Sequence, residues 1–424
     1  MHFLAPIAAL LAGVALLLLG SGLLGTLLVV QGSARGFGDA VLGLVMSGYF
    51  VGFLLGTFVA PGIVRRTGHI RAFAFFAALA ACSVLLHPVL ATPLWWFLLR
   101  VLTGAALVGL YTVIESWLSA QSAAADRGRV FALYMAVTLA ALAAGQHLLR
   151  LDDGAALPFI VAGVLVCAAM MPVVLTRQAQ PTLHETPRLS LRLLARRVPT
   201  AVGGAVFSGL LMGAFWAMAP LYATRIGLQD GQIAWFMSIG ILGGMALQWP
   251  IGRLSDRHDR RYALAGVALL AAAMAGATAL AAGTPALLYL AVFLYCGLAF
   301  AVYPISVAHL MDHLDPDQLL QGSSTVLLLH GLGATFSPVA AGLLMAWFGP
   351  GALWLYFLAL QLSLGFFVVW RIRRRQRDAA WEGHFLPMLR TTPAALEMLP
   401  DAEPVEPTGD PEGNAPAQPP QREG

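Results

Sequence analysis

The sequence predicts an all-α integral membrane protein in which twelve transmembrane helices form two parallel six-helix repeats. Of the 424 residues, 59% are hydrophobic and only 11% are charged, and the mean hydropathy is +0.77. Soluble domains are about 25% charged. Apolar runs of roughly 20 residues, long enough to cross about 30 Å of hydrocarbon, recur along almost the whole chain. A segment of the first half also aligns with one of the second half, which indicates an internal repeat.

Each apolar run is interpreted as one membrane span. The first run is longer than the apolar region of a signal peptide and has no basic flank, so we expect it to be a retained helix. The predicted spans are residues 4–30, 40–62, 70–90, 94–118, 129–149, 156–175, 200–222, 230–251, 262–282, 286–309, 320–346 and 351–370.

The repeat is visible when residues 46–71, "MSGYFVGFLLGTFVAPGIVRRTGHIR", are aligned with residues 237–262, "MSIGILGGMALQWPIGRLSDRHDRRY". Identical residues include Met46 and Met237, Ser47 and Ser238, Gly52 and Gly243, and Arg66 and Arg257. A polar, Pro-containing segment separates the two copies. We therefore predict an N-terminal repeat at 1–175, a cytoplasmic linker at 176–199, a C-terminal repeat at 200–377 and a disordered tail at 378–424.

The arginine distribution predicts the orientation of the spans, because loops on the cytoplasmic side carry an excess of basic residues. With the N-terminus inside, only Arg35, Arg150 and Arg225 lie in outside loops. The inside segments hold Arg65, Arg66, Arg71, Arg127, Arg129, Arg177, Arg188, Arg192, Arg196, Arg197, Arg253, Arg257, Arg260, Arg261, Arg371, Arg373, Arg374, Arg375 and Arg377. This predicts a multi-pass membrane protein with both termini in the cytoplasm.

The loop 252–261, "GRLSDRHDRR", has six charged residues and resembles the G-x-x-x-D-R-x-G-R-R signature of the major facilitator superfamily. Gly252, Asp256, Arg257, Arg260 and Arg261 match, while Asp259 stands where the signature has glycine. The first-half copy matches the signature only in part. Pro61 stands at the first glycine and Arg65 at the aspartate, while Arg66 and Gly68 match. "RVLTG" (100–104) is similar to the R-x-x-x-G motif of the same superfamily.

A finer resemblance, carried by residues 48–57 and 115–135, is to the uncharacterised YcaD-like bacterial branch. The G-P-x-x-G-G motif of drug antiporters is absent from 129–149, which weakens the interpretation of the chain as a drug/proton antiporter.

The resemblance implies a central cavity lined by the first, fourth, seventh and tenth spans. Aromatic, hydroxyl and amide side chains there would suit an amphipathic organic molecule, with packing as the alternative role for each residue. The candidates are Thr26, Gln31, Thr103, Tyr111, Trp216, Tyr222, Tyr295 and Tyr303.

Two ionisable residues within spans are candidates for the substrate or proton pathway, because a charge in the membrane interior is costly and is usually functional. Arg100 would attract an anionic group, or else cap carbonyl groups of a neighbouring helix. His330 could carry a proton, or else pack as a neutral ring beside Gly331.

A second group of charges is predicted to form a cytoplasmic gate. The resemblance implies that Glu115 pairs with Arg65 and Arg66, and that Asp312 pairs with Arg257 beside Asp256. The alternatives are that Glu115 pairs with Arg127 or Arg129 and only anchors its helix, and that loop 252–261 is an ordinary solvated run of charges.

No constellation of a soluble enzyme is present, and no Walker loop appears in the sequence. Together with this absence, the resemblance to the major facilitator superfamily implies a monomeric secondary transporter of the bacterial inner membrane, not an enzyme, that moves a small organic solute by alternating access and is coupled to protons. We expect no cofactor and no nucleic-acid partner. The alternative is a membrane receptor or assembly scaffold of the same fold that transports nothing.

Overall fold

The computed structural model describes residues 4–122, 126–151, 156–175 and 190–374, and every regular element within these ranges is a helix. Twelve stretches are long and apolar enough to cross a membrane, which confirms the predicted number of spans. The predicted tail at 378–424 and most of the predicted linker at 176–199 lie outside the described residues.

The first six spans are made of eight helical elements. These are α1 (Leu4–Ala34), α2 (Asp39–Thr67), α3 (His69–Leu86), α4 (Pro93–Gln121), α5 (Arg127–Gln146) with the 3-10 turn η2 (His147–Arg150), and α6 (Leu157–Ala168) with α7 (Met170–Val174). A short helix, α8 (Leu191–Arg197), occupies the end of the predicted linker and buries Leu194.

The last six spans repeat this arrangement. They are α9 (Pro199–Arg225), α10 (Asp230–Arg257), α11 (Arg260–Leu280), α12 (Pro285–Ala299) with α13 (Val302–Met311), α14 (Pro316–Phe348) and α15 (Ala352–Arg374). Most helix ends fall within a few residues of the prediction. Pro93, Pro199, Pro285 and Pro316 each occupy the first turn of a helix, where the missing N–H costs no hydrogen bond.

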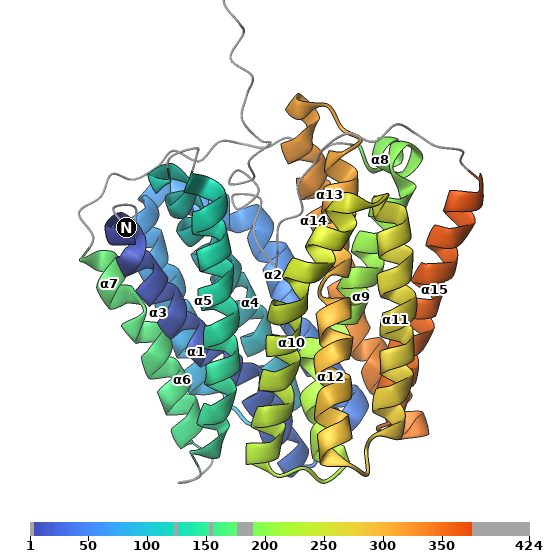
Figure 1. Ribbon diagram of the computed structural model, residues 1–424. Helices are drawn as coiled ribbons and strands as arrows, with labels where there is room; N and C mark the ends of the chain where they lie inside the picture. The colour runs from blue at the N-terminus through green and yellow to red at the C-terminus, as the bar shows by residue number, and fades with distance from the viewer. Residues whose placement is uncertain (1–3, 123–125, 152–155, 176–189, 375–424) are drawn as a thin grey trace, which may run out of the picture.

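The two halves stand side by side, with α1–α7 on one side and α9–α15 on the other (Figure 1). Across the boundary, α5 contacts α10 and α2 contacts α14. We call the end where α2, α10 and α15 terminate in arginines the Arg-rich end, and the end where α2 begins the Asp39 end.

Glycines at aligned positions of the repeat allow the same close helix contact in both halves. A Cβ atom on Gly52 would overlap the carbonyl oxygen of Val101 on α4, and one on Gly243 would overlap that of Phe293 on α12. Gly104 of the "RVLTG" motif lies equally close to the backbone of Tyr49. Small residues let transmembrane helices approach closely, so these glycines are explained by packing.

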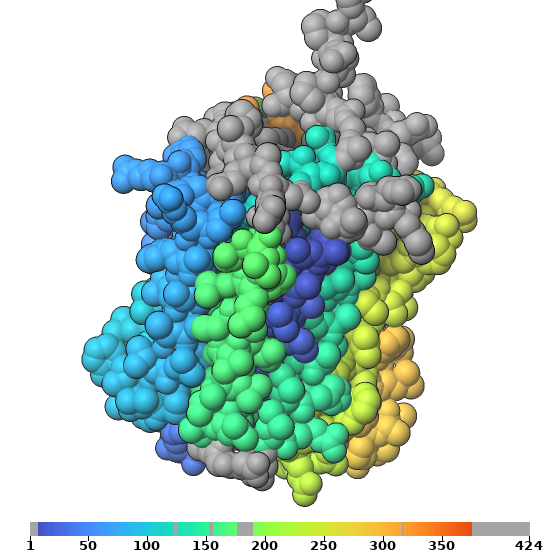
Figure 2. All heavy atoms as spheres, turned by 90° about the vertical axis from the view of Figure 1, so that its left-hand side faces the viewer, coloured from blue at the N-terminus to red at the C-terminus, as the bar shows by residue number. Residues whose placement is uncertain are grey.

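Large apolar side chains cover the outer surface of the bundle. The face shown in Figure 2 includes α3, α6 and α7. Phe75 of α3, Val164 of α6 and Met171 of α7 are all more than half exposed. Such a surface would promote aggregation of a soluble protein, but it suits contact with lipid chains.

Candidate functional site

A cavity lies between the two halves and contains about 800 Å³ of space free of atoms, including the part open to solvent. Most of its wall comes from α1, α2, α4 and α5, and the second half contributes Trp216, Ala217 and Met237. The polar residues and the tryptophan of the wall are Ser21, Thr26, Tyr49, Arg100, Tyr111, Tyr134, Thr138, Gln146 and Trp216.

Arg100 is the one charged residue among the cavity-lining residues of the described chain. Its side chain is 6% exposed, and its guanidinium lies 4.7 Å from the ring centroid of Tyr49 on α2. A planar guanidinium over an aromatic face is held in place by the negative face of the ring. The wall therefore presents a cation whose position is fixed by packing between α2 and α4.

A buried hydrogen-bond network forms another part of the wall. The Thr26 hydroxyl donates to Gln146 Oε1 at 2.5 Å, and Gln146 Nε2 donates to the Gly22 carbonyl oxygen at 2.8 Å. The Thr138 hydroxyl is buried without a hydrogen-bond partner among the described residues. Because a buried polar group without a partner is costly, Thr138 is well suited to bind water or a polar group of a ligand.

Four cavity residues, Gln146, Thr138, Tyr134 and Tyr49, were not predicted from the sequence. The first three lie on the fifth span, and Tyr49 lies on the second. The resemblance implied a cavity lined by the first, fourth, seventh and tenth spans. An amide at position 146 of a largely apolar span was a signal that could have identified this helix.

Four of the predicted cavity residues, Thr26, Arg100, Tyr111 and Trp216, line the cavity, and the other predicted residues do not. Gln31 accepts a hydrogen bond from Arg35 at 2.9 Å, near the Asp39 end. Thr103 faces α3, where its hydroxyl lies 2.8 Å from that of Ser83.

The remaining aromatic candidates pack within the second half. Tyr222 and Tyr295 both contact Trp354, with ring centroids 5.5 and 5.2 Å away. Tyr303 lies against His330, with ring centroids 4.7 Å apart. Neither Tyr303 nor His330 is among the cavity-lining residues, so the structure separates His330 from Arg100.

At the Asp39 end, polar contacts join the two halves. Arg225 of α9 pairs with Asp39 of α2 at 2.5 Å. Ser238 of α10 donates to the Ala143 carbonyl oxygen of α5 at 2.7 Å, and Trp235 packs on His147 with centroids 4.6 Å apart. These contacts hold the halves together on one side of the cavity.

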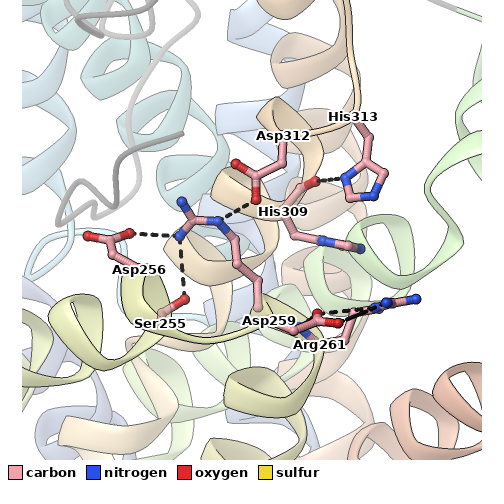
Figure 3. Close-up of polar contacts among 8 residues, drawn as sticks. Ser255, Asp256, Asp259, Arg261, His309, Asp312 and His313 are labelled. Carbon is pink, nitrogen blue, oxygen red and sulfur yellow. Dashed lines mark hydrogen bonds and ion pairs between the residues drawn. The ribbon is translucent and has the colours of Figure 1, made fainter. Parts of the chain in front are cut away.

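At the Arg-rich end, a charge network links three residues of the second half (Figure 3). Arg260, 6% exposed, donates to Asp256 Oδ1 at 2.9 Å and to Asp312 Oδ2 at 2.5 Å. We expected Asp312 to pair with Arg257, but the structure gives it Arg260 instead. The reason is that Arg260 begins α11 and faces the end of α13, whereas Arg257 ends α10 with its side chain exposed.

Asp259, which replaces a glycine of the superfamily signature, caps α11. Its carboxylate accepts from the Arg261 backbone N–H at 2.9 Å and from Arg261 Nη2 at 2.8 Å. Burial alone would raise the pKa of Asp259, but the hydrogen bonds and charge of Arg261 outweigh it, so the pKa lies below its usual value. The loop therefore uses a capping carboxylate in place of a flexible glycine.

Glu115, near the Arg-rich end of α4, is fully buried and accepts a hydrogen bond from the Tyr134 hydroxyl at 3.0 Å. Tyr134 also lines the cavity, so it connects this acid to the cavity wall. Arg65 and Arg66 are exposed at the end of α2. The pairing of Glu115 with these arginines stays a prediction.

The described residues contain no group of three or more His, Cys, Asp or Glu side chains that could hold a metal ion. The polar groups of the cavity are instead suited to an organic solute, with a cation, hydroxyl and amide groups, and aromatic faces.

Comparison with known proteins agrees with this architecture. Residues 10–302 and 201–394 match the family described as the Major Facilitator Superfamily. An uncharacterised MFS-type transporter of Enterobacter sp. (strain 638) is 30% identical over 350 residues, covering 80% of this chain and 89% of the relative. The uncharacterised MFS-type transporter YcaD of Escherichia fergusonii is 28% identical over 360 residues, covering 82% and 91%. These matches confirm the resemblance to the YcaD-like branch.

Solved transporter structures share the fold. The nucleoside transporter NupG superimposes with a TM-score of 0.68 at 17% identity, covering 88% of this chain and 100% of that chain. A bacterial homologue of the human lysosomal transporter Spinster, in an inward-facing and occupied conformation, gives a TM-score of 0.70 at 15% identity, covering 88% and 99%.

Proposed function

The chain belongs to the major facilitator superfamily, and from this premise we propose that it is a secondary active transporter that moves a small organic solute by alternating access, coupled to protons. We also propose that it works as a monomer in the bacterial inner membrane, with the Arg-rich end and both termini on the cytoplasmic side. The arginine distribution of the sequence supports this orientation.

The observation that carries the proposal is the cavity between the halves, with Arg100 as its fixed cation. A cavity with one cation, hydroxyl and amide groups, and the faces of Tyr111 and Trp216 suits a small solute that is partly polar and partly apolar. Arg100 would bind an anionic or strongly polar group of that solute, and the aromatic faces would cover its apolar part.

The contacts between the two halves at the Asp39 end support alternating access. In this arrangement the Arg225–Asp39 pair and the Ser238–Ala143 hydrogen bond close the Asp39 end. Opening that end requires these contacts to break, and since the Arg225 side chain is 35% exposed, water can replace the ion pair at a small cost. Transporters with repeated halves move by rocking one half against the other around a fixed central site.

Coupling to protons is supported by Glu115 and Tyr134. An acid within a membrane span is a functional candidate, and this one is hydrogen-bonded to a residue of the cavity wall. A proton from cavity water could reach Glu115 through the Tyr134 hydroxyl, which accepts one proton as it donates another. The sequence has no Walker loop through which ATP could supply the energy.

The test is transport by the purified protein in liposomes. A mixture of small organic acids, alcohols and amines is supplied outside, a proton gradient is imposed, and the lumen contents are measured by mass spectrometry. We expect one chemical class to accumulate, and a protonophore to abolish the accumulation. If no solute enters beyond protein-free liposomes, the chain is better explained as a receptor or scaffold of the same fold.

A further inference from the structure

A second hollow lies at the Arg-rich end, inside the second half and separate from the central cavity. It contains about 280 Å³ of space free of atoms, including the part open to solvent. Its polar wall brings together the end of α8, the start of α9, the start of α11, the end of α13 with the residue that follows Asp312, and the end of α15. The polar residues are Arg197, Thr200, Arg261, His309, His313 and Arg371, which we call the basic pocket.

The charges of the basic pocket favour an anion. Three of its side chains are guanidinium groups. Asp259 is paired with Arg261 at 2.8 Å, and Asp315 lies 3.9 Å from Arg197 with its side chain 68% exposed. No carboxylate is among the described residues that line the pocket, so the charges of its wall favour an anion.

The two histidines add hydrogen-bonding capacity to the wall. His309 is 5% exposed, and its ring packs against the His313 ring with centroids 4.5 Å apart. The His313 ring uses Nδ1 to contact the His309 carbonyl oxygen at 2.9 Å, which leaves its Nε2 available (Figure 3). A buried imidazole in such a wall would gain a partner from the oxygen atoms of a bound anion.

Aromatic side chains indicate how deep the pocket lies in a membrane. Tyr262 follows Arg261 and is 62% exposed, and Trp370 precedes Arg371 and is 46% exposed. The Arg374 guanidinium also lies 4.4 Å from the Trp370 ring centroid. Exposed Trp and Tyr residues gather at the level of lipid headgroups, so the basic pocket lies at that level too.

We propose that the basic pocket binds the phosphate of an anionic lipid headgroup. Basic pockets between transmembrane helices at this level are suited to such headgroups, since the acyl chains can remain in the bilayer while arginines hold the phosphate. Free phosphate has the same chemistry, but it would gain nothing from the aromatic residues around the pocket. The proposal is independent of transport, because it concerns a site outside the central cavity.

The experiment compares two doubly substituted proteins in an uncharged detergent after the lipids have been washed away. Arg197→Gln with Arg371→Gln removes two charges of the pocket. Arg253→Gln with Arg257→Gln is the matched control, because it removes two charges at the same end outside the pocket. Each protein is titrated with short-chain phosphatidylglycerol, short-chain phosphatidylcholine or inorganic phosphate, and bound molecules are counted by native mass spectrometry.

We expect the unmodified protein and the control to bind phosphatidylglycerol more tightly than phosphatidylcholine. The pocket variant should lose about 30-fold in affinity for phosphatidylglycerol, because each arginine near a lipid surface contributes about fivefold. Equal losses in the pocket and control variants would show general surface attraction and overturn the proposal. Pocket-dependent binding of inorganic phosphate as tight as that of the lipid would overturn the lipid assignment.

If the double variant does not fold, Arg371→Gln alone is compared with Arg257→Gln alone. A loss of about fivefold in affinity for phosphatidylglycerol, confined to Arg371→Gln, would support the proposal. The same affinity in the two single variants would overturn it.

Discussion

The Tyr134 hydroxyl donates a 3.0 Å hydrogen bond to Glu115 while the Tyr134 side chain lines the central cavity. This contact joins the buried acid of α4 to the space where a solute would bind. It also makes Tyr134 important for stability, since Glu115 is fully buried.

Tyr134→Phe should lower the free energy of unfolding by about 1–3 kcal/mol, because a buried carboxyl group loses one hydrogen bond. Thermal unfolding of the purified protein measures this. Tyr303→Phe is the control, since the Tyr303 hydroxyl is buried without a hydrogen-bond partner among the described residues. A larger loss in the control than in Tyr134→Phe would contradict the structural role given to this contact.

Glu115→Gln should abolish proton-driven accumulation of the solute found in the liposome screen, while solute exchange without a gradient continues. Gln has nearly the shape of Glu but cannot carry a proton at this position. Accumulation and exchange are measured on the same liposomes. Unchanged accumulation would remove Glu115 from the coupling path.

Arg100→Gln should lower the affinity for an anionic solute by about 10-fold or more, since a charge-assisted hydrogen bond contributes about 1.5–3 kcal/mol. Arg100→Lys should recover only part of it, because an ammonium cannot lie flat on the Tyr49 ring. Arg35→Gln is the matched control: this arginine also lies against an aromatic ring, 5.4 Å from Trp96, but outside the cavity. Ligand-induced thermal shifts provide the measurement, and an equal loss in Arg35→Gln would show that the effect is not local.

Asp39→Asn should favour opening of the Asp39 end, with a population change of a few-fold at most, since a partly exposed ion pair contributes about 1 kcal/mol or less. Ser21→Cys in a cysteine-free background reports cavity access to an impermeant maleimide from that side. Labelling should rise in Asp39→Asn and fall again when Asp39→Arg is combined with Arg225→Asp. Asp259→Asn, whose partner Arg261 is in the same half, should leave labelling unchanged.

Asp312→Asn should lower the free energy of unfolding by about 3–5 kcal/mol, because the buried Arg260 then loses a close counter-charge. Arg257→Gln, at an exposed position of the same loop, should change it by less than about 0.5 kcal/mol. Thermal unfolding of both variants separates the observed Arg260–Asp312 pair from the Arg257 pairing that the sequence suggested. A larger effect of Arg257→Gln would restore the original expectation.

The number, order and approximate ends of the spans were determined by the sequence alone, because exclusion of water from the bilayer acts on each apolar segment separately. The same holds for the position of the repeat. Gly52 and Gly243 are aligned in the sequence, and each lies against the backbone of a neighbouring helix in the structure. Close contact with another backbone requires a glycine at one specific position. Alignment of the two halves can therefore identify such a glycine from the sequence.

Partners of charged and aromatic side chains depend on how each helix is turned about its axis, and only the tertiary structure decided them. Asp312 pairs with Arg260 because the chain turns between α10 and α11, which buries Arg260 and leaves Arg257 exposed. Tyr222 and Tyr295 lie on the spans expected to line the cavity, yet their rings face Trp354. Gln146 reaches Thr26 across 120 residues of sequence. Hydropathy along one helix carries no information on the rotation of that helix against its neighbours, so these contacts follow from packing of the whole bundle.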